Sequence, residues 1–315
     1  MKLITQQDIT GLNISPVECL EWIRNSFSLK EKSVLPPKTC LHTRGIDFFT
    51  SMPCAIPERN VYGVKVVHRL SGAVPSLGSD ILLYNMNDGE LLAIMDGNWI
   101  TAMRTGAVTV LATQTLKKSG SVQYGVIGLG NTARAVILCL LENEPETMHR
   151  IGLLKYKDQA DLFIERFKGY RNVEFTLFSD VKELIRSTDI LYSCVTESKS
   201  LICEDDSAFR EGCLIVPVHT RGFQNCDLFF DKVFADDTAH VKDFKYFSQF
   251  RYFDELQNVV SGRKPGRESD TERILSYNVG LGLHDIYFAS RIYDMSAGLN
   301  TGSVNFPKDE RKFWI

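Results

Sequence analysis

A glycine-rich turn is the first place in this chain where residue types and spacing predict chemistry. Residues 122–133 read VQYGVIGLGNTA, a short apolar strand followed by two glycines and a helix start. Gly128 permits a tight turn, Gly130 lets the backbone approach a phosphate, and Ala133 lets the helix pack close to the strand. The N–H groups and positive dipole of the helix N-terminus favour an anion there. The turn therefore predicts a dinucleotide-binding site.

The residues after the next predicted strand indicate which dinucleotide is bound. NAD-binding units usually end this strand with an acid that accepts the ribose 2′-OH. Here the strand 151–154 is followed by Lys155-Tyr156-Lys157, and the first acid, Asp158, is placed to cap the next helix. Lysines at this tip would pair with the 2′-phosphate of NADP(H), although most lysines are simply surface residues. The pattern favours NADP(H) and leaves NAD(H) as the alternative.

The elements that would position this turn alternate between strand and helix from residue 121 onward. The apolar strand-like runs lie at 122–127, 151–154, 173–177, 190–195, 214–218 and 233–235. Segments with helical spacing separate them, and Asp180 is placed to cap one of these helices. This alternation is typical of a parallel, doubly wound sheet.

The first 120 residues have a different pattern. Helices are expected over 16–27 and 99–116, and strands over 61–68 and 81–85. A last helix over 282–293 could return to this region. The prediction is an α/β protein with a Rossmann domain (121–285) inserted into an α+β substrate-binding and dimerisation domain (1–120 plus 286–315).

Composition excludes several classes of protein. With 315 residues, 44% hydrophobic and 24% charged residues and a net charge of -3, the chain reads as globular, with no general attraction to nucleic acid. The start carries no apolar signal core, and no apolar run is long enough to span a bilayer. Eight scattered cysteines, with no CxxC pair or metal-type histidine spacing, predict reduced thiols, a cytoplasmic location and no metal site.

The segment AIMDGNWITAMRTGA at 93–107 is distinctive. It resembles the motif that the ornithine cyclodeaminase/mu-crystallin family carries ahead of its nucleotide-binding unit. Shorter matches at 36–38, 52–53, 63–67, 75–76 and 280–285 stand in the family's order. The resemblance implies an open, barrel-like sheet in the substrate domain, an inserted Rossmann domain and homodimers. It also implies a nicotinamide cofactor and small α-amino acids or cyclic imines as substrates, although at least one member is a binding protein.

Basic residues dominate the substrate site that the resemblance implies. Arg104 matches the arginine that binds the substrate carboxylate, and a guanidinium can hold a carboxylate by two parallel bonds. The alternative is an arginine on a helix surface. Lys65 is assigned to the substrate, and on an inward-facing strand position it would suit proton transfer; a lysine facing water is the alternative. Lys38 replaces a common arginine of the family, and nearby Arg44 could substitute for it.

One departure from the family bears on the reaction. Ornithine cyclodeaminases place an aspartate a few residues after the strand equivalent to 214–218, whereas this chain has His219-Thr220-Arg221. Arg221 would repel the second ammonium of ornithine or lysine, which favours an imine or keto-acid reductase or a substrate with a second anionic group. His219 could act as an acid/base near neutral pH or be structural. Asp236 could lie at the nicotinamide end of the sheet, or one of Asp236 and Asp237 could cap the next segment.

The sequence thus predicts an NADP(H)-dependent oxidoreductase acting on a small α-amino, α-imino or α-keto acid. A cyclodeaminase that recycles its hydride and a non-enzymatic NADPH-dependent binding protein are the alternatives. The predicted catalytic residues are Lys65 and Arg104, and the predicted substrate contacts are Lys38, Arg44, Met52, Lys65, Arg104, His219 and Asp236. The predicted cofactor contacts are Thr105, Gly128, Gly130, Asn131, Thr132, Ala133, Lys155, Tyr156, Thr196 and Val218.

Overall fold

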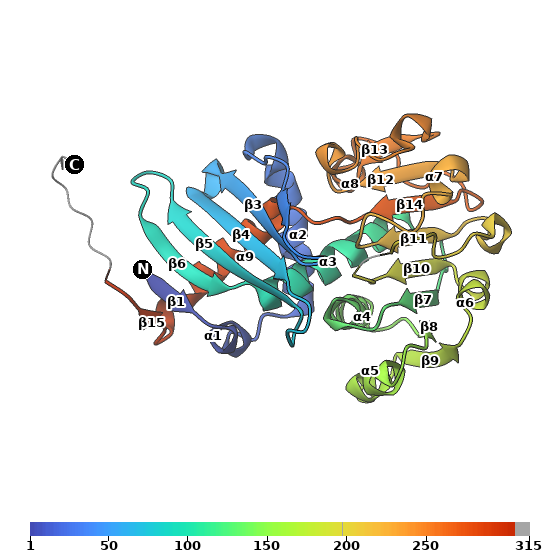
Figure 1. Cartoon of the computed structure of the whole chain (residues 1–315), viewed down its shortest axis with the longest axis horizontal. Helices are drawn as coiled ribbons and strands as arrows, with labels where there is room; N and C mark the ends of the chain where they lie inside the picture. Colours follow the sequence, from blue (N-terminus) through green and yellow to red (C-terminus); the bar gives the residue numbers. More distant parts are fainter. Residues whose placement is uncertain (197, 306–315) are drawn as a thin grey trace. The chain divides into compact units, whose positions relative to one another are not determined.

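The computed structural model describes residues 1–196 and 198–305, and its contacts divide the chain into two compact units (Figure 1). Unit 1 comprises Met1–Ile14, Leu29–Thr101 and the chain from Asp285 onward. Unit 2 comprises Ser15–Ser28 and Ala102–His284.

The sequence predicted a domain boundary at residue 120, but the units meet between Thr101 and Ala102, inside a helix. Helix α3 (Asn98–Leu116) crosses the boundary, and most of it belongs to unit 2. A Cβ on its Gly106 would lie 2.6 Å from the carbonyl oxygen of Ala135 in α4 (Asn131–Asn143), so the two helices touch backbone to backbone. Helix α2 (Pro16–Leu29) also joins unit 2, where Arg24 donates a hydrogen bond to Gln114 of α3. Close helix packing thus moves residues 15–28 and 102–120 into the second unit.

Unit 1 is built on a seven-stranded sheet that is antiparallel except for one parallel pair, β1 with β6. Its order is β15 (Gly302–Ser303), β1 (Lys2–Ile4), β6 (Leu91–Asp96), β5 (Leu77–Asn85), β4 (Val61–Arg69), β3 (Phe48–Ile56) and β2 (Thr39–His42). The strands predicted at 61–68 and 81–85 correspond to β4 and β5, and β5 begins four residues earlier than expected. Helix α1 (Gln6–Gly11) follows β1.

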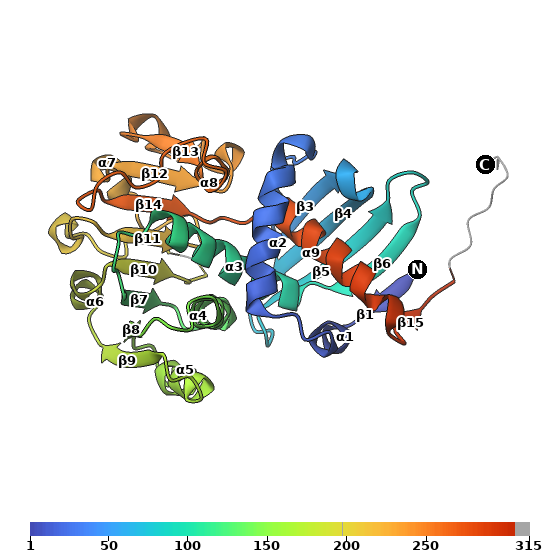
Figure 2. The ribbon, with the colours of Figure 1, turned by 180° about the vertical axis from the view of Figure 1, so that it is seen from behind.

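Helix α9 (Gly282–Met295) crosses one face of this sheet (Figure 2). A Cβ on Gly63 of β4 would lie 2.6 Å from Cδ1 of Ile286. Since any larger residue at 63 would collide with the helix, Gly63 sets how closely α9 approaches the sheet. The side chains of β4 alternate between this covered face and the opposite face.

Unit 2 contains an eight-stranded sheet in which every neighbouring pair is parallel. Its order is β13 (Phe253–Glu255), β12 (Lys232–Ala235), β14 (Ile274–Tyr277), β11 (Leu214–Pro217), β10 (Ile190–Ser193), β7 (Gln123–Ile127), β8 (His149–Leu154) and β9 (Val173–Phe178). The chain runs outward from β7 through β8 to β9 and then returns to β10 on the other side of β7. This is the predicted doubly wound sheet, with its switch point between β7 and β10.

The remaining helices of unit 2 are α5 (Gln159–Phe167), α6 (Val181–Ser187), α7 (Cys226–Phe229) and α8 (Leu256–Val260). Asp180 caps α6 as predicted, because its carboxylate accepts the Glu183 N–H. The predicted side-chain cap from Asp158 is wrong. Asp158 does precede α5, but its ψ of 2° is far from the extended cap conformation and its side chain makes no capping bond. Short 3₁₀ helices occur at Lys30–Lys32, Pro57–Arg59, Asp206–Ala208, Thr238–His240, Phe247–Gln249 and Ser296–Gly298.

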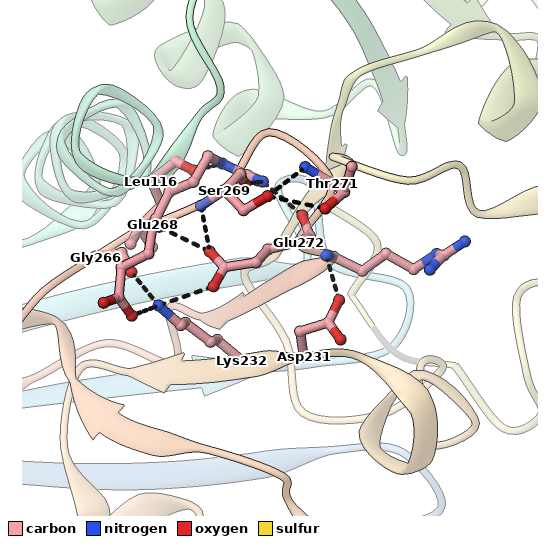
Figure 3. A network of polar contacts seen from close by, with 10 residues as sticks. Leu116, Asp231, Lys232, Gly266, Glu268, Ser269, Thr271 and Glu272 are labelled. Carbon is pink, nitrogen blue, oxygen red and sulfur yellow. Dashed lines mark hydrogen bonds and ion pairs between the residues drawn. The ribbon is translucent and has the colours of Figure 1, made fainter.

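A polar network ties the segment before β14 to the start of β12 (Figure 3). Lys232, the first residue of β12, donates to the carbonyl of Gly266 at 2.7 Å and pairs with the carboxylates of Glu268 and Glu272. The Asp231 carboxylate accepts the Arg273 N–H at 2.8 Å. These contacts lie at the amino ends of the strands, so they stabilise the edge opposite to the one where ligands of such sheets bind.

The eight cysteines are free thiols, six of them buried. Burial raises the pKa of several of them, including Cys54 and Cys194, to about 12. Among the described residues, no helix is long and apolar enough to cross a membrane. Residues 1–196 and 198–305 also contain no group of three or more His, Cys, Asp or Glu side chains that could hold a metal ion.

Candidate functional site

The glycine turn lies between β7 and α4 and is open where a phosphate would be expected. Gly128 has φ +81°, and a Cβ there would lie 2.8 Å from the backbone of Cys194 and Val195, so only glycine fits. Gly130 caps α4, and a Cβ there would meet nothing within 4 Å. No side chain caps this helix start. Open space in front of N–H groups that no side chain caps fits the pyrophosphate of a dinucleotide.

The predicted cofactor contacts near this turn lie along one edge of the sheet. The N–H of Cys194 donates to Ile127 O at 2.7 Å, and the N–H of Val218 donates to Ser193 O at 3.0 Å. The carboxyl ends of β7, β10 and β11 are therefore adjacent. This edge carries buried Ala133, half-buried Thr132 and Val218, and exposed Asn131 and Thr196. Thr105 is instead buried on α3.

The tip of β8 presents cations and no acid. Lys155, Tyr156 and Lys157 are exposed, and the Lys155 N–H donates to Phe178 O at 2.8 Å. Lys157 has a left-handed φ of +52°, and its Nζ lies 5.3 Å from the centre of the Tyr156 ring. Since β8 is the direct neighbour of β7, these side chains follow the strand beside the glycine turn. The arrangement is compatible with an anionic group on the ribose.

Arg104 lies on α3 and is only 6% exposed, so the alternative of an arginine on a helix surface is wrong. Its guanidinium lies against the backbone of Gly280, where φ is +86°. A Cβ at Gly280 would lie 2.5 Å from Nη1 and 3.0 Å from Nη2 of Arg104. Only glycine therefore combines this backbone conformation with this position of the guanidinium.

Asp236, directly after β12, holds the loop on which Arg104 rests. It is fully buried, and its Oδ2 accepts the Gly280 N–H at 2.8 Å. Asp237 is the member of the pair that caps the next segment, because its carboxylate accepts the Ala239 N–H at 2.8 Å. The structure thus assigns separate positions to these neighbouring acids: Asp236 supports the Gly280 loop, and Asp237 caps a 3₁₀ helix.

Lys65 points to the covered face of the unit 1 sheet, as predicted. It is fully buried between Met52 of β3 and Ile81 of β5, its partners across the sheet. Its Nζ lies 2.7 Å from Oδ2 of Asp285 in the first turn of α9, and both side chains have 0% exposure. Asp285 was not predicted as a site residue. The signal for it in the sequence is an acid that shares a helical stripe with Phe288, Ala289 and Ile292, all of which are fully buried.

His219 does not have the properties predicted for an acid/base near neutral pH. It follows β11 and is buried, and its Nε2 lies 2.7 Å from Oγ of Ser193. Burial lowers the pKa of His219 to about 4, so the imidazole is neutral at pH 7. Because the charged form is disfavoured, the structure supports a hydrogen-bonding role for this side chain.

The two other predicted basic contacts are more exposed. Lys38 is half-buried ahead of β2, and Arg44 is exposed in the turn between β2 and β3. The backbone of Arg44 closes this turn, because its carbonyl accepts the Asp47 N–H at 2.8 Å. Arg221, the cation in place of the family's aspartate, is exposed after β11.

Comparison with known proteins identifies the family. The model of the ornithine cyclodeaminase/mu-crystallin family matches residues 1–299. The chain belongs to this family. It is 26% identical over 260 residues to the mouse ketimine reductase mu-crystallin, covering 78% of this chain and 80% of that protein. It is 27% identical over 236 residues to the N-((2S)-2-amino-2-carboxyethyl)-L-glutamate dehydrogenase of Staphylococcus aureus, covering 70% and 69%.

A solved structure with a similar fold supports this family assignment. The Δ(1)-pyrroline-2-carboxylate reductase of Thermococcus litoralis, in complex with NADH and L-proline, has a TM-score of 0.84 and 25% sequence identity to this chain. The match covers 97% of this chain and 100% of that one. The predicted combination of a Rossmann-like sheet with a second α+β unit is therefore confirmed.

Proposed function

We propose that this protein is an NADP(H)-dependent oxidoreductase that transfers a hydride to or from the α-carbon of a small α-amino, α-imino or α-keto acid. The observation that carries the proposal is the buried Arg104, whose guanidinium rests on Gly280 in the unit that also contains the dinucleotide turn. The reductase and dehydrogenase names of the relatives support this class of reaction.

The residues present fit a nicotinamide dinucleotide. Gly128, Gly130 and the start of α4 would hold the pyrophosphate, and Lys155 with Lys157 would pair with a 2′-phosphate. When bound, the cofactor supplies or accepts a hydride. The cationic tip of β8 supports NADP(H), and NAD(H) is the alternative; the Thermococcus relative binds NADH.

The chain's own basic residues account for binding and proton transfer. Arg104 would hold the substrate carboxylate by a bidentate pair, which fixes the α-carbon. In the reductive direction the α-carbon of an imine gains a hydride, and its nitrogen gains a proton from Lys65 Nζ. In the oxidative direction the neutral amine of Lys65 takes that proton back. Lys38 and Met52 are proposed further contacts.

A cyclodeaminase of the family type is the second candidate. It would return the hydride to its substrate and release ammonia without net change of the cofactor. Arg221 disfavours it for ornithine and lysine, since an exposed cation after β11 repels a second ammonium. A binding protein without turnover is the third candidate.

The experiment is a screen of keto, imino and amino acids with NADPH and NADH, following both nicotinamide absorbance and ammonia. Net absorbance change supports the oxidoreductase, ammonia without such change supports the cyclodeaminase, and tight NADPH binding without turnover supports the binding protein. Arg104→Ala should raise KM at least tenfold. Arg24→Ala is the matched control, because Arg24 is an exposed arginine of the same unit. Unchanged KM in Arg104→Ala would refute the assigned role. We also propose a cytoplasmic homodimer, testable by fractionation and light scattering.

A further inference from the structure

The buried ion pair between Lys65 and Asp285 forms where α9 packs directly against Gly63 in the sheet of unit 1. Gly63 and Lys65 share the covered face of β4, two residues apart. The missing side chain of Gly63 accommodates Ile286. Because Ile286 packs against Gly63, the preceding residue, Asp285, lies close to the sheet, and its Oδ2 is 2.7 Å from Nζ of Lys65.

The environment of the pair favours both charges together and disfavours either one alone. Both side chains are inaccessible to solvent, so neither ion keeps its hydration. Asp285 lies in the first turn of the 14-residue helix α9, where the helix dipole stabilises an anion. Removing the carboxylate would take away the counter-charge that α9 supplies to the buried ammonium.

The other titratable groups around Lys65 do not replace Asp285. On β3, burial and the charge of Asp285 raise the pKa of Cys54 to about 12, so its thiol is neutral. Asp80 on β5 is exposed on the opposite face of the sheet. On α9, His284 directs Nδ1 to Oγ of Ser26 at 2.7 Å. Asp285 is thus the carboxylate that α9 brings to Lys65.

We propose that Asp285 is a positioning residue that keeps the ammonium of Lys65 protonated and fixed in one place. This inference rests on the proposed role of Lys65 in proton transfer. Lys65 gives a proton to the substrate nitrogen as the α-carbon gains a hydride, and it regains a proton from solvent after the product leaves. Asp285 itself neither gains nor loses a proton in this cycle.

The test compares Asp285→Asn with Asp294→Asn, which makes the same substitution on the same helix. Asp294 pairs with Arg59 but is 55% exposed, so its loss should change neither rate nor pH profile. In the reductive direction, where Lys65 donates the proton, Asp285→Asn should lower kcat/KM ten- to a hundredfold at pH 7. It should also move the alkaline limb of the pH profile to lower pH by at least about one unit, because a buried ammonium without its counterion loses its proton more readily. NADPH affinity should not change.

Two outcomes would overturn the proposal. One is an unchanged alkaline limb in Asp285→Asn; the other is a rate loss that is equal at all pH values and follows the loss of thermal stability. If Asp285→Asn does not fold, Asp285→Glu decides. This variant keeps the negative charge, so the alkaline limb of its pH profile should stay at the wild-type pH while kcat falls. A shift of the alkaline limb in Asp285→Glu would refute the positioning role of Asp285.

A measurement that does not need turnover separates this proposal from the proposed function. The Cε resonance of Lys65, assigned with Lys65→Arg, can be followed against pH by NMR. It should titrate at lower pH in Asp285→Asn than in the wild type. If no compound gives turnover but this shift occurs, the proposed function fails and the pairing role stands. If turnover occurs and the resonance does not shift, the pairing role fails alone.

Discussion

Replacing Gly280 by alanine should damage function far more than stability. The residue has φ +86°, a conformation in which an L-residue is less stable by about 1–2 kcal/mol. Part of this is offset because alanine also restricts the unfolded chain, by about 0.4–1 kcal/mol. A net loss of about 1 kcal/mol in the free energy of unfolding is therefore expected. The new Cβ would also lie 2.5 Å from Nη1 of Arg104, whereas ordinary contacts begin at 3.4 Å.

The guanidinium is the end of a flexible side chain, so it would move away rather than destabilise the fold. A displacement of about 1 Å can lower a rate by roughly a hundredfold when the displaced group orients the substrate. Gly280→Ala should thus reduce kcat/KM by ten- to a hundredfold, mostly through the affinity for carboxylate substrates. Urea unfolding and steady-state kinetics measure the two effects separately.

Gly262→Ala is the matched control. Gly262 has φ +72° in the same unit, and a Cβ there would meet nothing within 4 Å. This variant isolates the backbone penalty, so its stability should fall by about the same 1 kcal/mol with kcat/KM unchanged. If both variants retain the same kcat/KM within twofold, Arg104 does not hold the substrate from the position seen here.

Three further predictions concern the cofactor, pH and the fold. Lys155→Glu should lower the affinity for NADPH about tenfold while that for NADH changes little, and equal losses for both would refute the 2′-phosphate assignment. Burial raises the pKa of Asp227 from 3.8 to about 7. The folded state therefore keeps a proton that the unfolded chain releases, and wild-type stability should fall, by roughly 4 kcal/mol at most, as pH rises between these values. In Asp227→Asn, urea unfolding should not show this fall of stability with rising pH. The same pH dependence in the variant and the wild type would contradict the raised pKa of Asp227. Lys232→Met removes the cation that pairs with Glu268 and Glu272 and should lower the unfolding free energy by about 1–3 kcal/mol, whereas Lys168→Met, at an exposed pair, should leave the unfolding free energy unchanged.

Local patterns were enough to predict the sheet of unit 2 up to β12, because a glycine turn between an apolar strand and a helix depends on spacing within a few residues. The inward direction of Lys65 was predicted from the family resemblance, since the alternation along β4 shows only that Lys65 faces away from its neighbours Val64 and Val66. The cap at Asp180 was also predicted correctly from residues a few positions apart. The side-chain cap at Asp158 was predicted wrongly because capping needs an extended backbone at that residue, which its amino-acid type does not determine.

Contacts between distant residues were not accessible from one sequence. Gly280 accepts the Arg104 guanidinium, and Asp285 reaches Lys65, but neither pair is close in the chain. The strands β13 and β14 were not predicted because their apolar runs are at most two residues long, whereas the four-residue strands β10, β11 and β12 each carry a run of three. The unit boundary inside α3 likewise depends on the packing of Gly106 against α4, which a helical pattern over 99–116 does not reveal.

One short segment, residues 278–285, supports two buried cations, Arg104 in unit 2 and Lys65 in unit 1. Its loop part in unit 2 offers the Gly280 backbone to Arg104 and is fixed by Asp236. Its helical part begins α9 and brings Asp285 to Lys65 in unit 1. The two supports are chemically different: the arginine needs space and a fixed backbone, whereas the lysine needs a counter-charge. This difference explains the two residue types, which stand five positions apart: Gly280 has no side chain and leaves room for the arginine, and Asp285 provides a carboxylate on a short side chain for the lysine.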